Sequence, residues 1–265
     1  MSKKTFFSYN LMVNYMSDIT YSFILTILAG FSTMLGTILI FLKNDNQKIV
    51  LKSLSFAAGV MITVSIIDLI PESFNLLKNV FPIFPTIIYI LIFIVIGIIF
   101  SMLIDKYLPD NYISDTNLYR IGLISMLAII LHNIPEGIAT FMAGNADRKL
   151  GISMAIAIAL HNIPEGISIS VPIYYSTKSR GKALLYTFIS GISEPLGALI
   201  TYLFLQPFIN DRIMGFLFSI IAGIMIHIAT YELLPTANKY NNDKNRVIKW
   251  IIIGSLIMII SHFIF

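Results

Sequence analysis

Eight long apolar stretches, separated by short polar connections, limit the architectures that this chain can adopt. Each stretch is close to the ~20 residues that a helix needs to cross a hydrocarbon core about 30 Å thick. Hydrophobic residues make up 57% of the chain and charged residues 12%, so no polar segment is long enough to form a soluble domain. We therefore expect an all-α polytopic membrane bundle of eight transmembrane helices, forming one domain over residues 1–265 within a lipid bilayer. The expected spans are residues 20–42, 51–77, 84–108, 117–142, 150–175, 181–206, 212–236 and 246–265.

The distribution of positive charge predicts the orientation of these spans, because Lys and Arg concentrate in cytoplasmic connections. Twelve of the 18 Lys and Arg residues lie in or beside the odd-numbered connections, and six lie at the N-terminus or beside the even-numbered ones. We expect both termini to face outward from the cytoplasmic (inner) membrane. The net charge of +4 belongs to these connections, so it does not indicate a nucleic-acid partner.

A weak internal repeat relates the second span to the seventh. Residues 58–61 (Ala-Gly-Val-Met) recur as 222–225 (Ala-Gly-Ile-Met), and Asp68–Pro71 recurs as Glu232–Pro235, always 164 residues later. The two spans run in opposite directions, so the copies are inverted. The chain is thus expected to form three helices, a central pair and three inverted helices, an arrangement typical of secondary transporters.

A stronger repeat lies in the central pair of spans. The string His-Asn-Ile-Pro-Glu-Gly occurs at His132–Gly137 and again at His161–Gly166, in both cases within an apolar stretch. Ionisable groups at the bilayer centre cost at least ~2.5–3.5 kcal/mol each on insertion scales and are usually functional there. Hydrogen bonding between helices would not require the same polar string twice. The duplication therefore favours a binding site as the reason for these polar residues.

The spacing of the motif suits metal coordination. Residues four apart share a helix face, so His132 and Glu136 can reach one point, and so can His161 and Glu165. The chain has no cysteine, which excludes a thiolate site.

Asn133 and Asn162 can offer carbonyl oxygens to a neighbouring point, and Glu194 in the sixth span adds a carboxylate beside Pro195. Imidazole, carboxylate and amide oxygen together favour a borderline divalent ion such as Zn²⁺, Fe²⁺ or Mn²⁺. The ion would be bound and transported rather than kept as a cofactor. A packing contact is the alternative role for Glu194.

The paired motifs, the Ser193–Gly197 sequence (Ser-Glu-Pro-Leu-Gly) and the eight-span layout resemble the ZIP (Zrt/Irt-like) metal-ion transporters, most of all their bacterial ZupT-like branch. The resemblance covers nearly the whole chain and implies a binuclear metal centre bridged by Glu136 and Glu165. Many members have a histidine-rich loop between the third and fourth spans, but residues 108–120 contain no histidine, so metal sensing by that loop is not expected. The resemblance implies these ligands: His132, Glu136, His161 and Glu165 at the first position, and Asn133, Asn162, Glu165 and Glu194 at the second.

Several polar residues outside the motifs are candidates for a metal pathway. Asp68 and Glu232 lie near the outer end of the second span and the inner end of the seventh, where carboxylates are also common without a function. Ser65 shares a helix face with Asp68. His227 is either a ligand or a buried contact between helices, and His262 is expected at the membrane interface.

The sequence thus predicts a transporter, not an enzyme, that imports zinc, with iron, manganese, cobalt and cadmium as alternative ions. The direction of transport follows from the resemblance. A metal-selective channel and a proton-coupled exchanger remain open on the same scaffold. An intramembrane metalloenzyme is less favoured, because no His-Glu-x-x-His motif is present. The oligomeric state is open, with a homodimer as one candidate.

Overall fold

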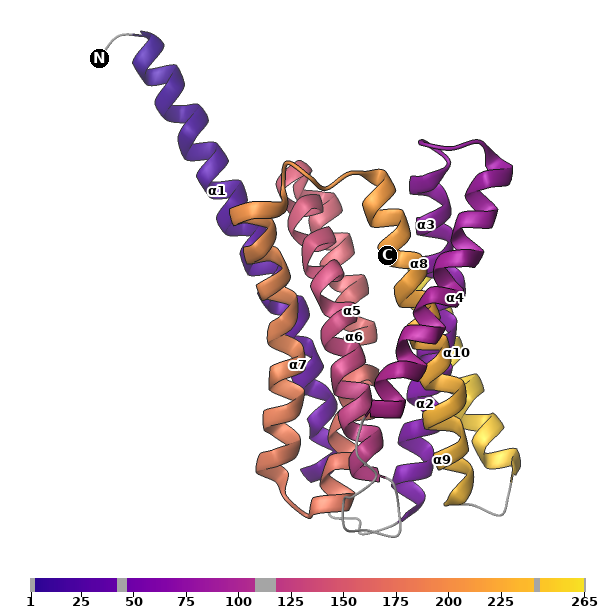
Figure 1. Ribbon diagram of the computed structural model, residues 1–265. Helices are drawn as coiled ribbons and strands as arrows, with labels where there is room; N and C mark the ends of the chain where they lie inside the picture. Colours follow the sequence, from indigo (N-terminus) through magenta and orange to yellow (C-terminus); the bar gives the residue numbers. More distant parts are fainter. Residues whose placement is uncertain (1–2, 42–46, 108–117, 241–243, 265) are drawn as a thin grey trace.

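The computed structural model describes residues 3–41, 47–107, 118–240 and 244–264, and the regular structure in these residues is entirely helical (Figure 1). Eight helical segments are long and apolar enough to cross a membrane, which confirms the predicted all-α, eight-span fold. Predicted span ends at residues 42, 108, 117 and 265, and most of the third connection, lie outside the described residues. The candidate spans are Asp18–Phe41, Lys48–Leu77, Ile83–Lys106, Leu118–Ala146, Arg148–Thr177, Arg180–Leu205, Asp211–Lys239 and Asn245–Ile264.

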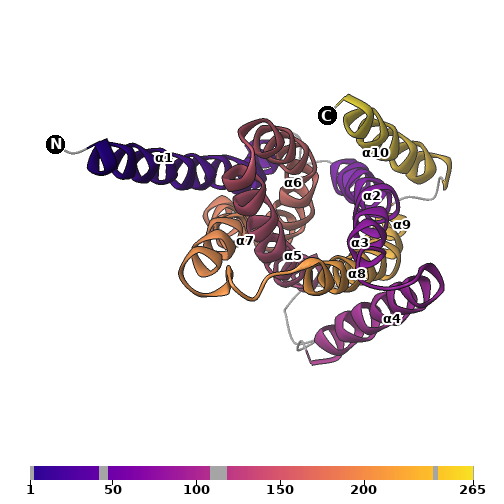
Figure 2. The ribbon, with the colours of Figure 1, turned by 90° about the horizontal axis from the view of Figure 1, so that it is seen from above.

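The first, fourth, fifth and sixth spans pack together as one group, which we call the site bundle (Figure 2). The site bundle carries both copies of the repeated motif, and α5 and α6 pack along each other. Its helices are α1 (Lys3–Ser32) with the 3₁₀ segment η1 (Thr33–Phe41), α5 (Leu118–Ala146), α6 (Arg148–Thr177), and α7 (Arg180–Ile200) with the π-helical turn η3 (Thr201–Leu205).

The remaining four spans form a second group, which we call the flanking bundle. Its two outermost helices, α4 and α10, lie on either side of the others (Figure 2) and expose many large apolar side chains, as lipid-facing helices do. Its elements are α2 (Gln47–Val64), η2 (Ser65–Leu69), α3 (Ile70–Leu77), α4 (Ile83–Tyr107), α8 (Asp211–His227), η4 (Ile228–Leu233), α9 (Leu234–Lys239) and α10 (Lys244–Ile264).

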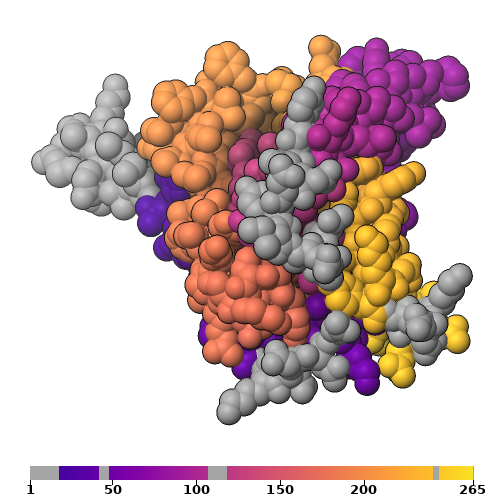
Figure 3. Space-filling view, turned by 60° about the horizontal axis from the view of Figure 1, so that its bottom comes forward, coloured from indigo at the N-terminus to yellow at the C-terminus, as the bar shows by residue number. Residues whose placement is uncertain are grey.

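Figure 3 shows the end of the molecule that carries the odd-numbered connections. Salmon and orange side chains of α6 and α7 gather on one side, and yellow side chains of the C-terminal helices lie on the other.

The second and seventh spans share a local irregularity that the sequence reading did not predict. Each contains a π-helical turn, η2 or η4, that ends two residues before the repeated proline, Pro71 or Pro235. A proline ring crowds the carbonyl one turn earlier, and a widened turn relieves that contact. The repeated sequence is therefore accompanied by a repeated backbone geometry.

Two close helix crossings also correspond. Gly59 of α2 lies against the backbone of Ile251 in α10, and Gly223 of α8 lies against the backbone of Ile94 in α4, so that a Cβ at either glycine would collide with a carbonyl oxygen. Gly59 and Gly223 are the positions related by the sequence repeat. This correspondence supports the inverted repeat, which stays a prediction.

A one-residue connection aligns the two central helices. Asp147 joins α5 to α6, and its side chain caps α6 by accepting a hydrogen bond of 2.9 Å from the Leu150 amide. His132 lies fifteen residues before Asp147 and His161 fourteen residues after it. Because the helices are antiparallel, the two motifs face each other at the same depth.

Candidate metal centre

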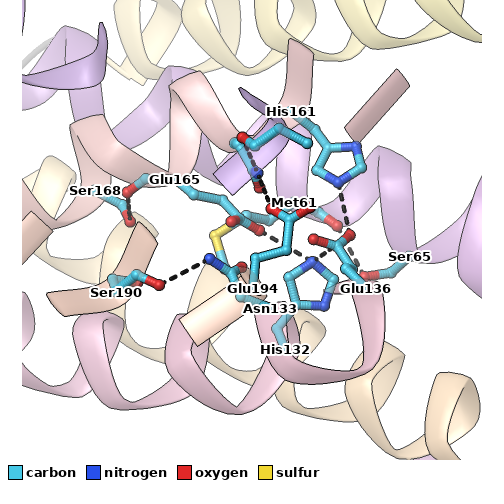
Figure 4. Close-up of polar contacts among 12 residues, drawn as sticks. Met61, Ser65, His132, Asn133, Glu136, His161, Glu165, Ser168, Ser190 and Glu194 are labelled. Atoms are coloured by element: carbon cyan, nitrogen blue, oxygen red, sulfur yellow. Dashed lines mark hydrogen bonds and ion pairs between the residues drawn. The ribbon is translucent and has the colours of Figure 1, made fainter. Parts of the chain in front are cut away.

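The two copies of the motif meet between α5 and α6, and their polar side chains are buried. His161 Nε2 lies 2.7 Å from Glu136 Oε1, and His132 Nε2 lies 3.0 Å from the same oxygen (Figure 4). Ligand atoms from these three residues lie within 4.8 Å of one another, close enough to hold a metal ion. The family resemblance implied that these residues meet, and the structure brings them together.

Glu165 joins the same cluster from α6. Its Oε1 lies 3.2 Å from His132 Nε2, so each copy of the motif supplies a carboxylate to a histidine of the other. This pairing across the helices adds to the contact between His132 and Glu136 within α5, which the spacing of four residues predicted. The pairing across helices could not be predicted from the spacing, because it depends on how α5 and α6 face each other.

The two asparagines are held by backbone carbonyls of neighbouring helices. Asn133 Nδ2 donates to the Ser190 carbonyl of α7 at 3.1 Å, and Asn162 Nδ2 donates to the Ala29 carbonyl of α1 at 2.9 Å. Asn162 Nδ2 also lies 2.9 Å from Glu194 Oε2, which brings Glu194 to the site. Because the amide nitrogens are occupied in this way, the carbonyl oxygens are free to accept.

Several buried oxygens of the cluster have no hydrogen-bond partner. Within the part of the chain that the structure describes, those with neither a hydrogen bond nor an ion pair are Glu136 Oε2, Glu165 Oε2, Glu194 Oε1, Asn133 Oδ1 and Asn162 Oδ1. Buried polar atoms are nearly always paired, because an unpaired acceptor forfeits its hydration without compensation. All five atoms are acceptors, so the group that would satisfy them is a cation or a set of donors. The donor set fits a divalent transition-metal ion.

A glycine lets α7 approach this cluster. Gly137 follows Glu136, and a Cβ at Gly137 would collide with the backbone carbonyl of Glu194. Small residues at helix crossings in membranes allow backbones to come this close. The last residue of the repeated motif thus places the carboxylate of the sixth span beside α5.

A cavity of about 430 Å³ leads to the cluster between the two bundles. Its lining runs from the exposed Glu72 and Asn75 of α3 to the buried Glu136 and His161. Both Glu72 and Asn75 belong to α3, which leads into the second connection at the top of Figure 1.

The structure separates the candidate pathway residues. Asp68 lines the cavity. Ser65 is buried and donates to the Met61 carbonyl of its own span at 2.8 Å. Glu232 and His227 lie elsewhere, the former close to Asp105 and the latter bonded at 2.9 Å to Ser101 of α4. Roles for Ser65, His227 and Glu232 in a metal pathway stay predictions.

Two features of the site could not be predicted from the sequence: the carbonyl partners of the two asparagines, and the pairing of His262 with Asp68. The carbonyls that orient the asparagines belong to Ala29 and Ser190. Any residue has a backbone carbonyl, so the identity of these two residues does not indicate the role. His262, expected at the interface, is partly exposed and pairs with Asp68 across the cavity mouth. The presence of both residues in one membrane protein did not predict that pairing, because 194 residues separate them in the chain.

Comparison with known proteins identifies the family of this chain. The sequence model of a family described as "ZIP Zinc transporter" matches residues 109–262. The "Zinc transporter ZupT" of Clostridium perfringens is 40% identical, over 94% of this chain and 98% of its own length. Proteins of the same name from Chlorobaculum parvum and Streptococcus mutans are each 41% identical, over 94% and 92% of this chain and 100% and 97% of their own lengths. The chain therefore belongs to the ZIP family of metal-ion transporters.

Proposed function

We propose that this protein imports zinc across the cytoplasmic membrane through a two-ion site between α5, α6 and α7. The observation that carries the proposal is the set of buried, unpaired acceptor oxygens beside two histidines at the centre of the bundle. Nothing in a lipid environment satisfies such groups, whereas a divalent cation does. The names of the curated relatives favour zinc among the ions that this donor set accepts.

The first ion position would use His132, Glu136, His161 and Glu165. Two imidazoles and two carboxylates make a donor set that Zn²⁺ accepts in tetrahedral sites, at distances of about 2.0–2.2 Å. The present spacings of 2.7–3.2 Å between ligand atoms are near the separation that such a tetrahedron requires. This position therefore needs little rearrangement of side chains.

The second position would use the free oxygens of Asn133, Asn162 and Glu194, together with Glu165. Glu136 and Glu165 each place one oxygen near a histidine and leave the other unpaired. A carboxylate with its two oxygens in different surroundings can bridge two ions. Neutral amides bind divalent cations weakly, so the second position would be the weaker one and would depend on Glu194.

Passage would follow alternating access between the two bundles. The cavity reaches Glu136 and His161 from the end predicted to face outward. Toward the other end, Arg120 of α5 binds Asp105 of α4, with Nη2 2.7 Å from Oδ1 and 2.6 Å from the main-chain oxygen. This ion pair joins the site bundle to the flanking bundle, so it would hold the inner side closed while the outer side is open.

Two other mechanisms use the same scaffold. A channel would give flux that rises linearly with concentration, whereas a carrier saturates. A proton-coupled exchanger would respond to a pH gradient at constant metal concentration. The enzyme alternative does not apply, because the family is one of transporters.

The test is uptake by purified protein in sealed proteoliposomes. Zn²⁺, Fe²⁺, Mn²⁺, Co²⁺ and Cd²⁺ are offered separately, each with and without a pH gradient. We expect saturable Zn²⁺ uptake, with the other ions slower or bound more weakly. Uptake equal to that of empty vesicles for all five ions would refute the proposal, and uptake that does not saturate would replace the carrier with a channel.

A further inference from the structure

The mouth of the cavity holds a histidine–carboxylate pair from two different spans. His262 Nδ1 of α10 lies 2.5 Å from Asp68 Oδ1 of η2. The His262 side chain is 42% exposed and that of Asp68 is 28% exposed, so neither is buried, and each is held in place by the other.

Both residues line the same cavity as the buried histidine of the central site. The cavity lining includes Asp68, Glu72 and His262 near the mouth, and Glu136 and His161 at its deep end. Glu72 is one turn beyond Asp68 along the helix and is exposed. An ion that moves through this cavity toward His161 therefore passes an imidazole and two carboxylates first.

The pair belongs to the flanking bundle, whereas the ligands of the central site belong to the site bundle. Asp68 and His262 are therefore separate from the two-ion site, although they share its access route. Because Asp68 and His262 belong to the flanking bundle, they would not move with an ion that the site bundle carries inward.

We propose that Asp68 and His262, assisted by Glu72, form a capture site that binds a hydrated divalent transition-metal ion outside and passes it to His161. This inference rests on the proposed function and adds a third, transient binding position to it. An imidazole and one or two carboxylates are sufficient to replace part of the hydration shell of Zn²⁺, with water keeping the remaining positions.

The geometry suits transient binding. Ligands about 2.0–2.2 Å from a tetrahedral Zn²⁺ lie about 3.3 Å from each other. The pair would need to open by roughly 1 Å from its hydrogen-bonded distance to admit an ion. The hydrogen bond re-forms when the ion leaves, so the metal-free pair keeps both ligands in place and competes with the bound ion.

The first experiment measures zinc uptake into proteoliposomes as a function of concentration. We expect His262→Ala and Asp68→Asn to raise KM at least about tenfold, the loss typical when a metal ligand loses its support. The maximal rate should stay within twofold of the wild type, because the central site is intact. Ile260→Ala, an exposed position on the same helix that does not line the cavity, is the matched control and should change neither value.

A second variant separates metal binding from a purely structural contact. His262→Gln can still hydrogen-bond Asp68 but is a poor zinc ligand, so capture predicts a raised KM for it as well. A wild-type KM in His262→Gln, or a lost maximal rate with an unchanged KM in His262→Ala, would overturn the capture site.

A binding measurement avoids transport altogether. Since the chain has no cysteine, His262→Cys gives a single thiol that can be labelled without background. Zinc chloride alone should protect this thiol from a maleimide, and protection should weaken in the Asp68→Asn background. An absence of zinc protection would contradict the inference. Failure of the proposed function would instead appear as an inactive wild type, or as full activity without Glu165.

Discussion

The imidazole of His161 lies 2.7 Å from the carboxylate of Glu136, so a histidine from the second copy of the motif contacts a glutamate from the first. The two copies of the string therefore contribute to one cluster of side chains rather than to two. Each copy supplies a partner to the other, because the antiparallel α5 and α6 place the two motifs at the same depth. Removing a carboxylate from either helix should disturb ligands on both.

The second ion position can be tested through Glu194. Glu194→Gln keeps the size of the side chain but removes the charge that would hold the weaker ion, so bound zinc should fall from two ions toward one per chain. Transport should be slowed or altered in ion preference, whereas His161→Ala should remove most of it. Metal counting by mass spectrometry after dialysis, combined with uptake assays, checks both. A silent His161→Ala beside an inactive Glu194→Gln would instead make the asparagine-side position the main one.

The approach of α7 to α5 can be tested at Gly137. A methyl group there would collide with the backbone carbonyl of Glu194, and overpacking of this kind typically costs about 1–3 kcal/mol. We expect Gly137→Ala to lower the thermal unfolding temperature and to weaken zinc binding at the second position. Gly181→Ala, where the nearest atom to a new Cβ is 3.9 Å away, is the control and should leave both unchanged. Equal effects at the two glycines would argue against a specific crossing.

The ion pair between Arg120 and Asp105 predicts a change in accessibility. A partly exposed ion pair contributes up to about 1 kcal/mol, enough to shift a two-state equilibrium roughly fivefold. A cysteine at the cavity-lining Ala157 should react with an impermeant maleimide from outside, and adding Arg120→Ala should slow that reaction.

The control for this prediction is Arg180→Ala, because Arg180 donates to the Ile40 carbonyl within the site bundle. It should leave the labelling rate at Ala157→Cys unchanged. An unchanged rate in Arg120→Ala as well would show that the pair does not hold the inner side closed.

The predicted orientation can be tested at two helix caps. Asp147 and Ser179 are the N-caps of α6 and α7, so replacing each by cysteine carries a similar local cost. Asp147→Cys should label from outside intact cells, and Ser179→Cys should label only after the membrane is opened. The reverse pattern would invert the orientation and, with it, the direction in which the cavity opens.

The spans and the residues of the central cluster could be predicted because their signals are local. A run of about 20 apolar residues is sufficient to predict a span, and a spacing of four is sufficient to place His132 beside Glu136. The duplication then identified the helices that carry the site. None of these predictions required knowledge of how distant segments of the chain pack together.

The remaining features depend on tertiary contacts. Glu136 pairs with His161, Asn162 with the Ala29 carbonyl, and His262 with Asp68, each across different helices. A hydrogen bond to a backbone carbonyl cannot be predicted from the identity of the residue that carries it. The π-helical turns before Pro71 and Pro235 likewise required the structure, since a proline alone predicts a distortion but not its form.

The assignment of the metal site is tested most directly by zinc uptake in the Glu165→Ala variant. Glu165 would serve both ion positions, so Glu165→Ala deprives each ion of a charged ligand, and the protein should still insert because α6 becomes more apolar. Uptake of Zn²⁺ into proteoliposomes should be saturable for the wild type and indistinguishable from empty vesicles for Glu165→Ala, with fewer bound ions per chain. A Glu165→Ala protein that transports zinc at the wild-type rate would contradict the assignment of the metal site.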